Sequence, residues 1–327
     1  MKVLHLSYSK DIDEDGGISF AIKELLNNQT NFETEWLCNN TQPKIFRDFK
    51  LIQKISKSSF DLVHIHGLWR SQNRLAAYHF MNTKPYIIAP HGMIDKWALS
   101  QSNFKKKIAF LLWEKKGLKN AKCLHALCEN EVKELRNFFP NTPIALIPNS
   151  VRFPDVKNLT FSNPVWGNSF RKSEKILLFL GRFHKKKGIE ELLNAWKIFT
   201  SLNSQTSWRL VFVGYGDKDF INKKINSEKI KFAKIFGRVS GKLKDSTFYN
   251  SNAFILPSFS EGLPIAAIEA MTFKLPCLLS EQCNFNHLNK LKGIINAEPD
   301  VRSILLSLNK LNQLSDNELK GIGEISY

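Results

Sequence analysis

Two glutamates stand eight positions apart in PSFSEGLPIAAIEAM, residues 257–271, and could contact a bound sugar nucleotide. Glu261 precedes a Gly-Leu-Pro turn, and Glu269 lies two helical turns further on. Carboxylates accept hydrogen bonds from hydroxyls, so one glutamate could hold a ribose and the other a transferred sugar. Amides at a helix start suit an anion; here they lie around the turn formed by Gly262, Leu263, Pro264 and Ile265, in which Pro264 suits the first helical turn and has no N–H of its own. The open alternative makes Glu261 a residue that complements the helix dipole, and Glu269 a surface helix residue.

A second turn carries cations. LLFLGRFHKKKGIEELL predicts a strand, a basic loop and a helix, with Arg182 and Lys187 near the helix start. Side-chain charge there adds to the partial positive charge of the helix N-terminus. Because the loop follows a strand directly, an anion site suited to a diphosphate is favoured over a solvated basic loop.

Glycine turns and histidines give weaker signals. Gly16 and Gly17 open the first expected helix, whereas VGYGD at 213–217 lacks the third glycine of a dinucleotide fingerprint, which disfavours NAD binding. His64 and His66 share one face of an expected strand. The sequence shows no third ligand, so we interpret both as structural or acceptor-side residues and not as metal ligands.

The elements that must position these residues are short apolar runs alternating with helical patterns such as 16–28 and 187–199. This alternation is typical of parallel α/β architecture, in which ligands bind beyond the carboxyl ends of the strands. The expected strands are 2–9, 34–38, 61–67, 85–92, 123–129, 144–151, 175–182, 208–216, 230–237, 252–258, 275–281 and 293–299.

The chain of 327 residues is long enough for two domains. Periodicity breaks between 149 and 175 in a stretch rich in Asn, Ser and Pro. We therefore predict two Rossmann-like, doubly wound α/β domains facing each other across a cleft: residues 1–152, a linker over 153–174, and residues 175–327. Five cysteines without a CxxC pair predict reduced core thiols.

A formal net charge of +17 calls for an anionic partner: nucleic acid, a membrane face or a phosphorylated ligand. Between Trp97 and Lys116 an apolar stripe falls at helical spacing amid lysines 105–107, 115 and 116; it consists of Phe104, Ile108, Leu111 and Leu112. We interpret the stripe as packing on the first sheet, and the lysines as a peripheral contact with an anionic bilayer. Without an expected signal peptide or spanning segment, the prediction is a cytoplasmic protein, with this contact at the inner membrane face.

Taken in order, GRFHKKKG, VGYGD, FGRVSG and PSFSEGLPIAAIEAM resemble the glycogen-synthase-like retaining glycosyltransferases of the GT-B type (glycosyltransferase family 4, glycosyl transferases group 1). In the first half, the GG turn, HIHGLW and PHGMIDKWALSQSNFKKKIAFLLWEKKGLKNAKCLHALCENE resemble the subset found in bacterial surface-polysaccharide and lipopolysaccharide assembly. The resemblance covers nearly the whole chain, and the E-x7-E and R-x4-K elements are its most specific parts.

The resemblance assigns roles to individual residues. It implies that Arg182 and Lys187 bind the donor diphosphate, that Glu269 binds the ribose and that Glu261 lies beside the transferred sugar. The amides near Gly262, Leu263, Pro264 and Ile265 would join that contact. Arg238 and Val239 would lie by the base, and Gly17 and His91 would face the donor from the first domain. It also implies that the chain, which stops at Tyr327, lacks the family's final crossover helix.

The same resemblance implies an activity. It indicates a hexosyltransferase that uses a nucleoside diphosphate sugar, needs neither a cofactor nor a metal, and transfers with retention to a glycan or lipid-linked acceptor. Two alternatives stay open: a nucleotide-sugar epimerase of the same fold, and a basic nucleic-acid-binding protein. Against the second, the basic runs are not interleaved with aromatic residues, so no nucleic-acid partner is expected.

Overall fold

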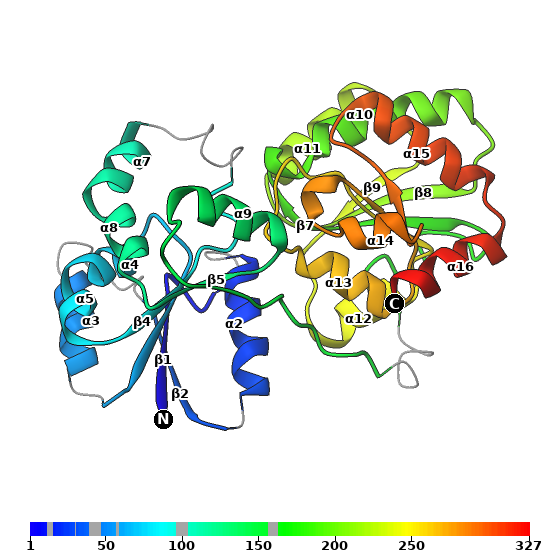
Figure 1. Ribbon diagram of the computed structural model, residues 1–327. Coiled ribbons are helices and arrows are strands. Elements are labelled where there is room, and N and C mark those ends of the chain that lie inside the picture. The colour runs from blue at the N-terminus through cyan, green and yellow to red at the C-terminus, as the bar shows by residue number, and fades with distance from the viewer. Residues whose placement is uncertain (12–15, 30, 39–46, 57–58, 96–103, 156–162) are drawn as a thin grey trace. The chain divides into compact units, whose positions relative to one another are not determined.

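The computed structural model describes residues 1–11, 16–29, 31–38, 47–56, 59–95, 104–155 and 163–327. The chain divides into two compact units, residues 1–150 and 151–327. Each unit is built on its own six-stranded parallel sheet (Figure 1). The twelve runs expected to be strands all contain one, which confirms the prediction of a chain with two parallel α/β domains.

The first unit has the strand order β2-β1-β3-β4-β5-β6. Its strands are β1 (Lys2–Ser7), β2 (Glu33–Cys38), β3 (Leu62–His66), β4 (Tyr86–Ala89), β5 (Cys123–Ala126) and β6 (Ile144–Leu146). Its helices are α2 (Gly17–Asn28), α3 (Arg47–Ser56), α4 (Ser71–Leu75), the π-helical turn η2 (Ala76–Phe80), α5 (Met81–Thr83), α7 (Phe104–Ala109), the π-helical turn η3 (Phe110–Glu114), α8 (Lys115–Lys119) and α9 (Glu129–Phe138).

The two faces of the first sheet differ in chemistry. Side chains alternate between the faces of a strand, so Leu4, Leu6, Val63 and Ile65 point to one side. These residues join the apolar core of this unit with residues of α3, α4 and α8. The opposite face becomes polar toward the carboxyl ends of these strands, where Val3 and Leu62 are followed at alternate positions by histidines and a serine.

The second unit has the strand order β12-β11-β10-β7-β8-β9. Its strands are β7 (Lys175–Phe183), β8 (Trp208–Gly216), β9 (Ala233–Phe236), β10 (Ala253–Leu256), β11 (Cys277–Leu279) and β12 (Ile294–Asn296). Its helices are the 3-10 turn η5 (Lys185–Lys187), α10 (Ile189–Leu202), α11 (Lys218–Ser227), α12 (Gly241–Tyr249), α13 (Ile265–Thr272), the 3-10 turn η6 (Glu281–Cys283), α14 (Asn286–Lys290), α15 (Val301–Gln313) and α16 (Asp316–Ser326).

The core of the second unit involves both faces of its sheet. The central strands are nearly continuous apolar runs such as KILLF and RLVFV, as expected where helices cover both faces. In Figure 1, α10, α11 and α15 lie on one side of this sheet and α12 and α13 on the other. Residues of all five helices belong to a single buried apolar cluster with the strands.

Part of the expected linker belongs to this core. Trp166 is buried in the apolar cluster of the second unit, and Val165 and Phe170 pack against it. The Val165 amide also donates to Thr247 Oγ1 of α12 at 3.3 Å. The second unit therefore begins before β7; residues 156–162 lie outside the described residues.

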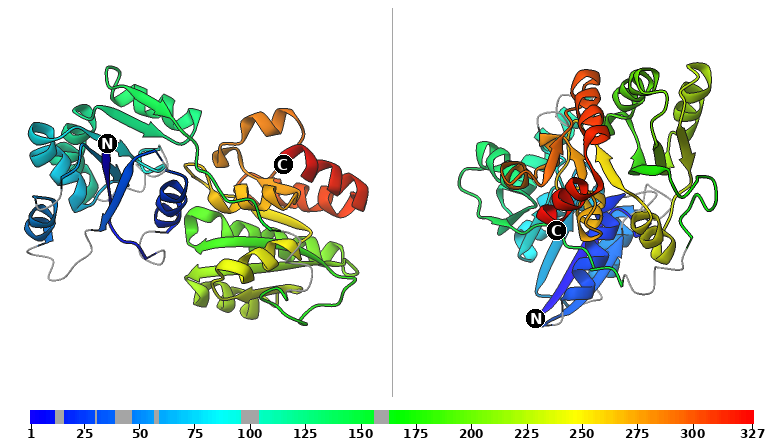
Figure 2. Two further views of the ribbon diagram at one scale, coloured as in Figure 1. Left: turned by 90° about the horizontal axis from the view of Figure 1, so that it is seen from below. Right: turned by 90° about the vertical axis from the view of Figure 1, so that its right-hand side faces the viewer.

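The last two helices, α15 and α16, follow one another in the second unit (Figure 2). Ser315 and Glu318 form a capping box at the start of α16. Ion pairs then tie this helix back to the same unit: Lys175 with Asp316 at 2.6 Å, and Lys274 with Glu324 at 2.9 Å.

Two further expectations concern thiols and membrane spans. All five cysteines are free thiols, and Cys128, Cys277 and Cys283 are buried. Among the described residues, no helix combines the length and the apolar character that crossing a membrane would need.

Candidate donor-binding site

The predicted phosphate-binding turn and the predicted glutamate turn are neighbours in the structure. The strands β7 and β10 pair with each other at the point where the strand order of the second sheet reverses. Loops that follow such strands are where doubly wound sheets bind ligands. A backbone hydrogen bond joins the two loops, since the Phe259 amide donates to the Lys186 carbonyl at 2.8 Å.

A glycine permits this close approach. Gly188 separates η5 from α10 and has φ +66°, in the left-handed region that favours glycine. A Cβ added at Gly188 would lie 2.0 Å from the Pro257 carbonyl oxygen. Only a residue without a side chain can therefore hold the start of α10 against the loop after β10.

Lys187 and Glu261 form an ion pair within this arrangement. The ammonium Nζ lies 2.5 Å from Glu261 Oε1, and the side chains are 20% and 11% exposed. Ser258 Oγ donates to the same carboxylate oxygen at 2.6 Å. Burial alone would raise the pKa of Glu261, but the charges of Lys187 and Lys186 and these hydrogen bonds outweigh it and lower the pKa. Glu261 is therefore an ionised carboxylate that pairs with a lysine. Its role is more than the complement of a helix dipole that the alternative assigned to it.

An asparagine side chain holds the turn after Glu261 through two hydrogen bonds. Asn284 Nδ2 donates to the carbonyls of Glu261 at 2.9 Å and Gly262 at 2.6 Å. Leu263 completes the turn, Pro264 caps α13, and the helix itself begins at Ile265. The carbonyls of this turn thus face Asn284, an arrangement that fixes the turn at the start of α13.

Glu269 is not an exposed surface residue. It lies on α13 and is only 12% exposed, and its carboxylate forms an ion pair with Lys244 of α12. This contradicts the alternative of an ordinary surface helix position. Both glutamates of the E-x7-E element are therefore paired with a lysine in the structure.

Three further predicted residues gather at the carboxyl ends of β7, β8 and β9. Arg182 is exposed on β7 and pairs in register with Tyr215 of β8. The Arg238 guanidinium lies 5.8 Å from the centre of the Tyr215 ring. Val239 follows it and is buried. This end of the sheet thus presents two arginines beside an aromatic ring.

Gly17 and His91 belong to the first unit. Gly17 is exposed at the first position of α2, after Gly16 at φ +62°. His91 follows β4 with φ +55°, and its Nε2 lies 3.0 Å from His66 Nδ1. Burial, helped by the nearby His125, lowers the pKa of His91 to about 3, so its imidazole is neutral at neutral pH.

The sequence alone did not indicate several residues that hold this site. Ser258 and Lys244 bond the two glutamates, and Asn284 holds the turn between them. Ser258 was within reach of prediction because it precedes Glu261 by three residues in the same loop. Lys244 and Asn284 come from other elements, and no local pattern marks either residue.

In the first unit, side-chain hydrogen bonds also hold the loop after β3. Asn73 Nδ2 donates to the Gly67 carbonyl at 3.1 Å, and Glu114 Oε1 accepts from the Trp69 amide at 2.6 Å. Burial raises the pKa of Glu114 to about 8, although the bonds from Trp69 and Trp113 and the charge of Arg74 act in the opposite direction. Glu114 is therefore mostly protonated at neutral pH.

The apolar stripe of α7 and η3 does not pack on the first sheet. Phe104 is 78% exposed, Leu111 73% and Leu112 54%. The interpretation that the stripe belongs to the core is therefore wrong, because these side chains project from the helices toward solvent. The preceding residues 96–103, which include Trp97, lie outside the described part of the chain.

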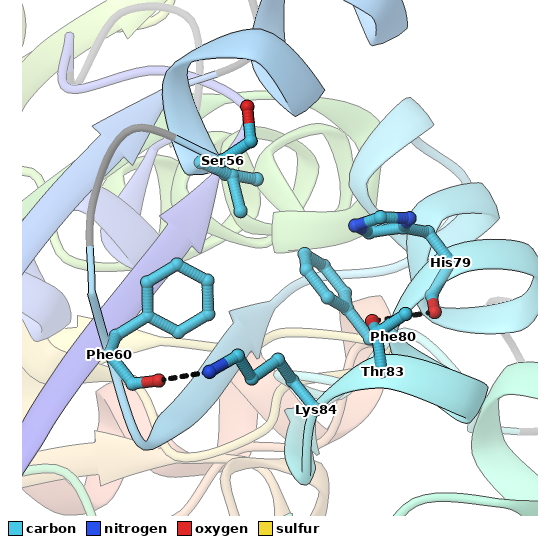
Figure 3. Close-up of a pocket in the computed structure, with 7 residues that line it drawn as sticks. Ser56, Phe60, His79, Phe80, Thr83 and Lys84 are labelled. Carbon is cyan, nitrogen blue, oxygen red and sulfur yellow. Dashed lines mark hydrogen bonds between the residues drawn. The ribbon is translucent and has the colours of Figure 1, made fainter.

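A hollow of about 230 Å³ lies at a different place in the first unit. It is bordered by residues of α3, η2 and α5, and Lys84 there donates to the Phe60 carbonyl at 3.0 Å (Figure 3). Phe60 and Lys84 precede β3 and β4, so the hollow lies at the amino ends of these strands. This is the edge opposite to the one where sheets of this type bind ligands.

Comparison with known proteins identifies the family. Residues 26–153 match the family model described as Glycosyltransferase Family 4, and residues 165–321 match the model described as Glycosyl transferases group 1. The chain is 24% identical over 233 residues to an "Uncharacterized 41.2 kDa protein in cps region" of Klebsiella pneumoniae, covering 70% of this chain and 62% of that protein.

Two functionally named relatives match as well. An Escherichia coli UDP-Gal:alpha-D-GlcNAc-diphosphoundecaprenol alpha-1,3-galactosyltransferase is 26% identical over 310 residues, 88% of this chain and 75% of that protein. A GDP-mannose:cellobiosyl-diphosphopolyprenol alpha-mannosyltransferase of Xanthomonas campestris is 26% identical over 227 residues, 68% of this chain and 56% of that protein.

Solved structures share the fold. Sucrose-phosphate synthase from Thermosynechococcus elongatus superposes with a TM-score of 0.80 at 16% identity, covering 99% of this chain and 92% of that one. Anabaena Alr3699/HepE, crystallised with UDP and glucose, gives a TM-score of 0.72 at 15% identity, with 100% and 93% covered. By fold and by both family models, the chain belongs to the GT-B glycosyltransferases of family 4.

Proposed function

We propose that the protein is a retaining glycosyltransferase. It moves a hexosyl group from a nucleoside diphosphate sugar to a hydroxyl of a glycan or lipid-linked acceptor in the synthesis of a cell-surface polysaccharide. The observation that carries this proposal is the contact between the β7 and β10 loops, which sets Lys187 against Glu261 at a strand-order reversal.

The charges of this site suit the chemistry of a leaving diphosphate. Negative charge grows on the diphosphate as the glycosidic bond breaks, so fixed cations lower the barrier. Lys187 is already fixed beside the start of α10, and Arg182 is exposed at the end of the adjoining strand. These cations and the helix N-terminus would supply the positive charge without a metal ion at the donor site.

Binding of a donor changes the partner of Lys187. In the structure its counterion is Glu261; a diphosphate would compete for the ammonium and leave Glu261 free to contact the sugar. Glu269 would accept hydrogen bonds from the ribose in the same way, beside its ion-pair partner Lys244. The acceptor hydroxyl would attack on the face that the diphosphate leaves, with the leaving phosphate taking its proton.

The relatives favour transfer over the alternatives. The E. coli and Xanthomonas proteins are named for transferring galactose and mannose from UDP and GDP donors to sugar diphosphate lipids. An acceptor of this lipid-linked type is therefore proposed here as well. Neither an epimerase nor a nucleic-acid-binding protein gains support from any of these matches.

The lipid-linked acceptor gives the exposed stripe of the first unit a role. Phe104, Leu111 and Leu112 project from α7 and η3, and Lys107, Lys115 and Lys116 lie along the same helices. An exposed apolar stripe flanked by lysines is the chemistry that binds an anionic bilayer surface. We propose that this surface, the stripe and its lysines, rests on the membrane that holds the acceptor.

Thermal unfolding with nucleotides tests the donor site. The purified protein is titrated with UDP, GDP, ADP and CMP in the absence of divalent metal, because a ligand that binds only the folded state raises the unfolding temperature. We expect one nucleoside diphosphate to stabilise the protein selectively. CMP, which lacks the second phosphate, should have little effect.

Two variants control the experiment. Lys187→Ala removes the cation at the site, whereas Lys197→Ala removes a lysine of α10 that pairs with Glu228 on the surface. The stabilisation should disappear in the first variant and persist in the second. A lack of response to every nucleotide, or an equal response in both variants, would contradict the proposed donor site.

A further inference from the structure

A cluster of buried histidines lies in the first unit, and its three central members, His5, His64 and His66, take no part in the proposed donor site. His5 and His66 are 0% and 2% exposed, and His64 is 8% exposed. His91 and His125 extend the cluster through hydrogen bonds to His66 and His64. So many imidazoles on one buried face of the sheet call for an explanation, because the other face of the same strands is apolar.

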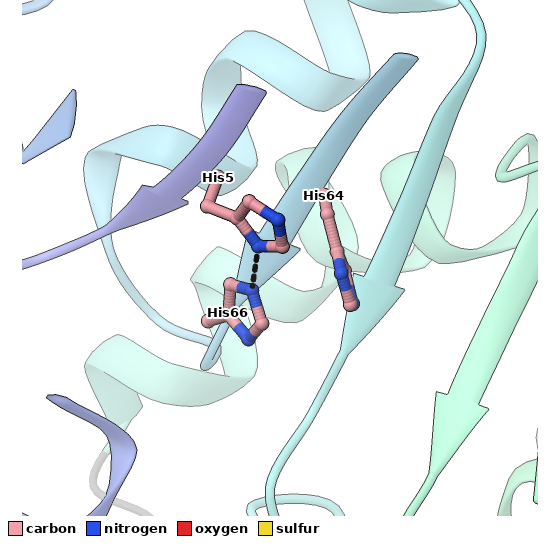
Figure 4. Close-up of side chains that lie close together, drawn as sticks. All are labelled: His5, His64 and His66. Atoms are coloured by element: carbon pink, nitrogen blue, oxygen red, sulfur yellow. Dashed lines mark hydrogen bonds between the residues drawn. The ribbon is translucent and has the colours of Figure 1, made fainter. Parts of the chain in front are cut away.

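Strand register brings the three central histidines together. His64 and His66 are two residues apart on β3 and therefore point to one face of the sheet. His5 on the neighbouring strand β1 stands opposite His64. One ring nitrogen from each of the three lies within 4.8 Å of the others (Figure 4). The third candidate ligand, which the HIHG motif alone did not reveal, is thus His5.

The distance between two of these nitrogens suits a shared metal ion. His5 Nδ1 and His66 Nε2 are 3.1 Å apart. Two imidazole nitrogens bound to one tetrahedral Zn²⁺ at the usual length would be about 3.3 Å apart. A metal ion could therefore replace the hydrogen bond between these rings with little movement of either strand.

Each of the three rings has a hydrogen-bond partner on its other nitrogen. The Ile147 carbonyl can only accept, so His125 Nε2 donates to it at 2.8 Å and His125 Nδ1 accepts from His64 Nε2 at 3.3 Å. His64 Nδ1 therefore keeps its lone pair. Gln29 Oε1 lies 3.1 Å from His5 Nε2, and His91 Nε2 lies 3.0 Å from His66 Nδ1.

This pattern is the one that metal-ligating histidines adopt. Such residues usually donate the N–H of the other ring nitrogen to a fixed acceptor, which orients the ring toward the ion. With Gln29 and His125 as acceptors, lone pairs remain on Nδ1 of His5 and Nδ1 of His64. In the hydrogen-bonded form His66 Nε2 donates to His5 Nδ1 at 3.1 Å. A metal-bound form would instead leave a lone pair on His66 Nε2 and have His66 Nδ1 donate to His91 Nε2.

We propose that His5, His64 and His66 bind one divalent transition metal ion, with Zn²⁺ as the best match. Imidazole ligands suit zinc, and a water molecule can complete a site with three protein ligands. The ion would tie β1 to β3 at the strand-order reversal of the first sheet.

Cobalt titration tests the site independently of any transferase activity. The protein is prepared without a polyhistidine tag, stripped with a chelator and titrated with Co²⁺, whose visible absorption reports nitrogen ligands and coordination number. We expect one equivalent of Co²⁺ to bind with a tetrahedral or five-coordinate spectrum. Zn²⁺ should then displace it and raise the unfolding temperature.

Variants locate the binding. His64→Gln removes a ligand but keeps an amide that can donate to His125, and His287→Ala removes an exposed histidine of α14 as the matched control. The cobalt spectrum should vanish in the first variant and persist in the second. Equal binding by both variants, or no uptake by the wild-type chain, would overturn the proposal.

A measurement on the wild-type chain covers the case in which His64→Gln does not fold. With ¹⁵N-labelled histidine, Zn²⁺ should shift the ring signals of His5, His64 and His66. Shifts confined to exposed histidines such as His184 and His287, or the absence of any shift, would show that the buried cluster is a metal-free hydrogen-bonded network.

Discussion

At the scale of single residues, the second unit pairs each glutamate of its E-x7-E element with a lysine. Lys187 neutralises Glu261 and Lys244 neutralises Glu269, and all four side chains are at most 20% exposed. Carboxylates this far from solvent need a nearby cation to stay ionised. Each of the two carboxylates thus has a lysine of the second unit as its counterion.

The Lys187–Glu261 contact predicts a coupling that unfolding experiments can measure. Lys187→Ala leaves the Glu261 carboxylate without its cation and should destabilise the second unit by about 2–4 kcal/mol. Glu261→Gln in addition removes the unpaired charge, so the double variant should recover part of this loss. We expect a coupling free energy of about 1–3 kcal/mol from urea unfolding of the four proteins.

A surface pair provides the matched control for that cycle. Lys197 and Glu228 are 49% and 31% exposed and lie 3.1 Å apart. Solvent screens such pairs, so the corresponding cycle should give less than about 1 kcal/mol. Equal coupling in the two cycles would mean that the Lys187–Glu261 pair is as solvated as a surface pair.

The sequence predicted the site residues that lie together in one chain segment, and it missed those that reach the site from other elements. Arg182, Lys187, Glu261 and Glu269 lie in or beside two strand-to-helix turns, each of which a single chain segment reveals. Lys244, Asn284 and His5 contact the sites through other elements. His5 was missed for a clear physical reason: only the parallel register of β1 with β3 places it opposite His64, and that register is a tertiary property.

At the scale of elements, the junction between η5 and α10 positions the proposed donor site. It approaches the loop after β10 so closely that Gly188 has no room for a Cβ. The alternation of apolar runs and helices predicted the strands on either side, because buried parallel strands require continuous apolar segments. The depth of this contact could not be predicted, since it depends on how two loops distant in sequence pack.

Gly188→Ala is expected to disrupt this junction. The new Cβ would meet the Pro257 carbonyl oxygen at 2.0 Å, and the residue would keep a left-handed φ of +66°. We expect a loss of about 2–4 kcal/mol in unfolding free energy, together with loss of nucleotide binding. Urea unfolding and nucleotide titration of the variant measure both effects.

A variant at Gly167 is the matched control, because it tests backbone strain without a steric clash. Its φ is +51°, but nothing lies within 4 Å of an added Cβ. Gly167→Ala should therefore show only the strain of a left-handed alanine, about 1–2 kcal/mol, with nucleotide binding intact. If the two variants proved equally stable, the close approach at Gly188 would not be an energetic constraint.

Helical periodicity was less informative for α7 and η3. The stripe of Phe104, Leu111 and Leu112 has the spacing of a core-facing helix, yet the structure exposes it. An amphipathic pattern shows that a helix has an apolar face and does not show what covers that face. The π-helical turn within η3 also changes the residues per turn, which a fixed period cannot represent.

At the scale of the whole molecule, the net charge of +17 and the exposed stripe support membrane contact. We expect the protein to co-sediment with vesicles that contain anionic lipid and much less with neutral ones. Binding should weaken as salt rises, because lysines at an anionic surface are screened. The double variant Leu111→Asp/Leu112→Asp should lose most of the binding without loss of stability, since both side chains are exposed.

A control variant in the other unit completes this experiment. Leu202 at the end of α10 is 69% exposed and lies outside the proposed membrane surface. Leu202→Asp should bind anionic vesicles as the wild type does. Sedimentation that does not depend on anionic lipid content would remove the proposed membrane contact and leave the donor site unaffected.

The central claim is that Lys187 acts on the diphosphate of a nucleotide sugar during glycosyl transfer. The most direct measurement uses a sugar nucleotide with the base that stabilises the protein in the thermal titration. The rate at which the nucleoside diphosphate is released from it is compared for wild type, Lys187→Ala and Lys197→Ala. Loss of one such cation should slow release about 10²- to 10³-fold, with Lys197→Ala near the wild-type rate. A folded Lys187→Ala variant that releases the diphosphate at the wild-type rate would contradict the account.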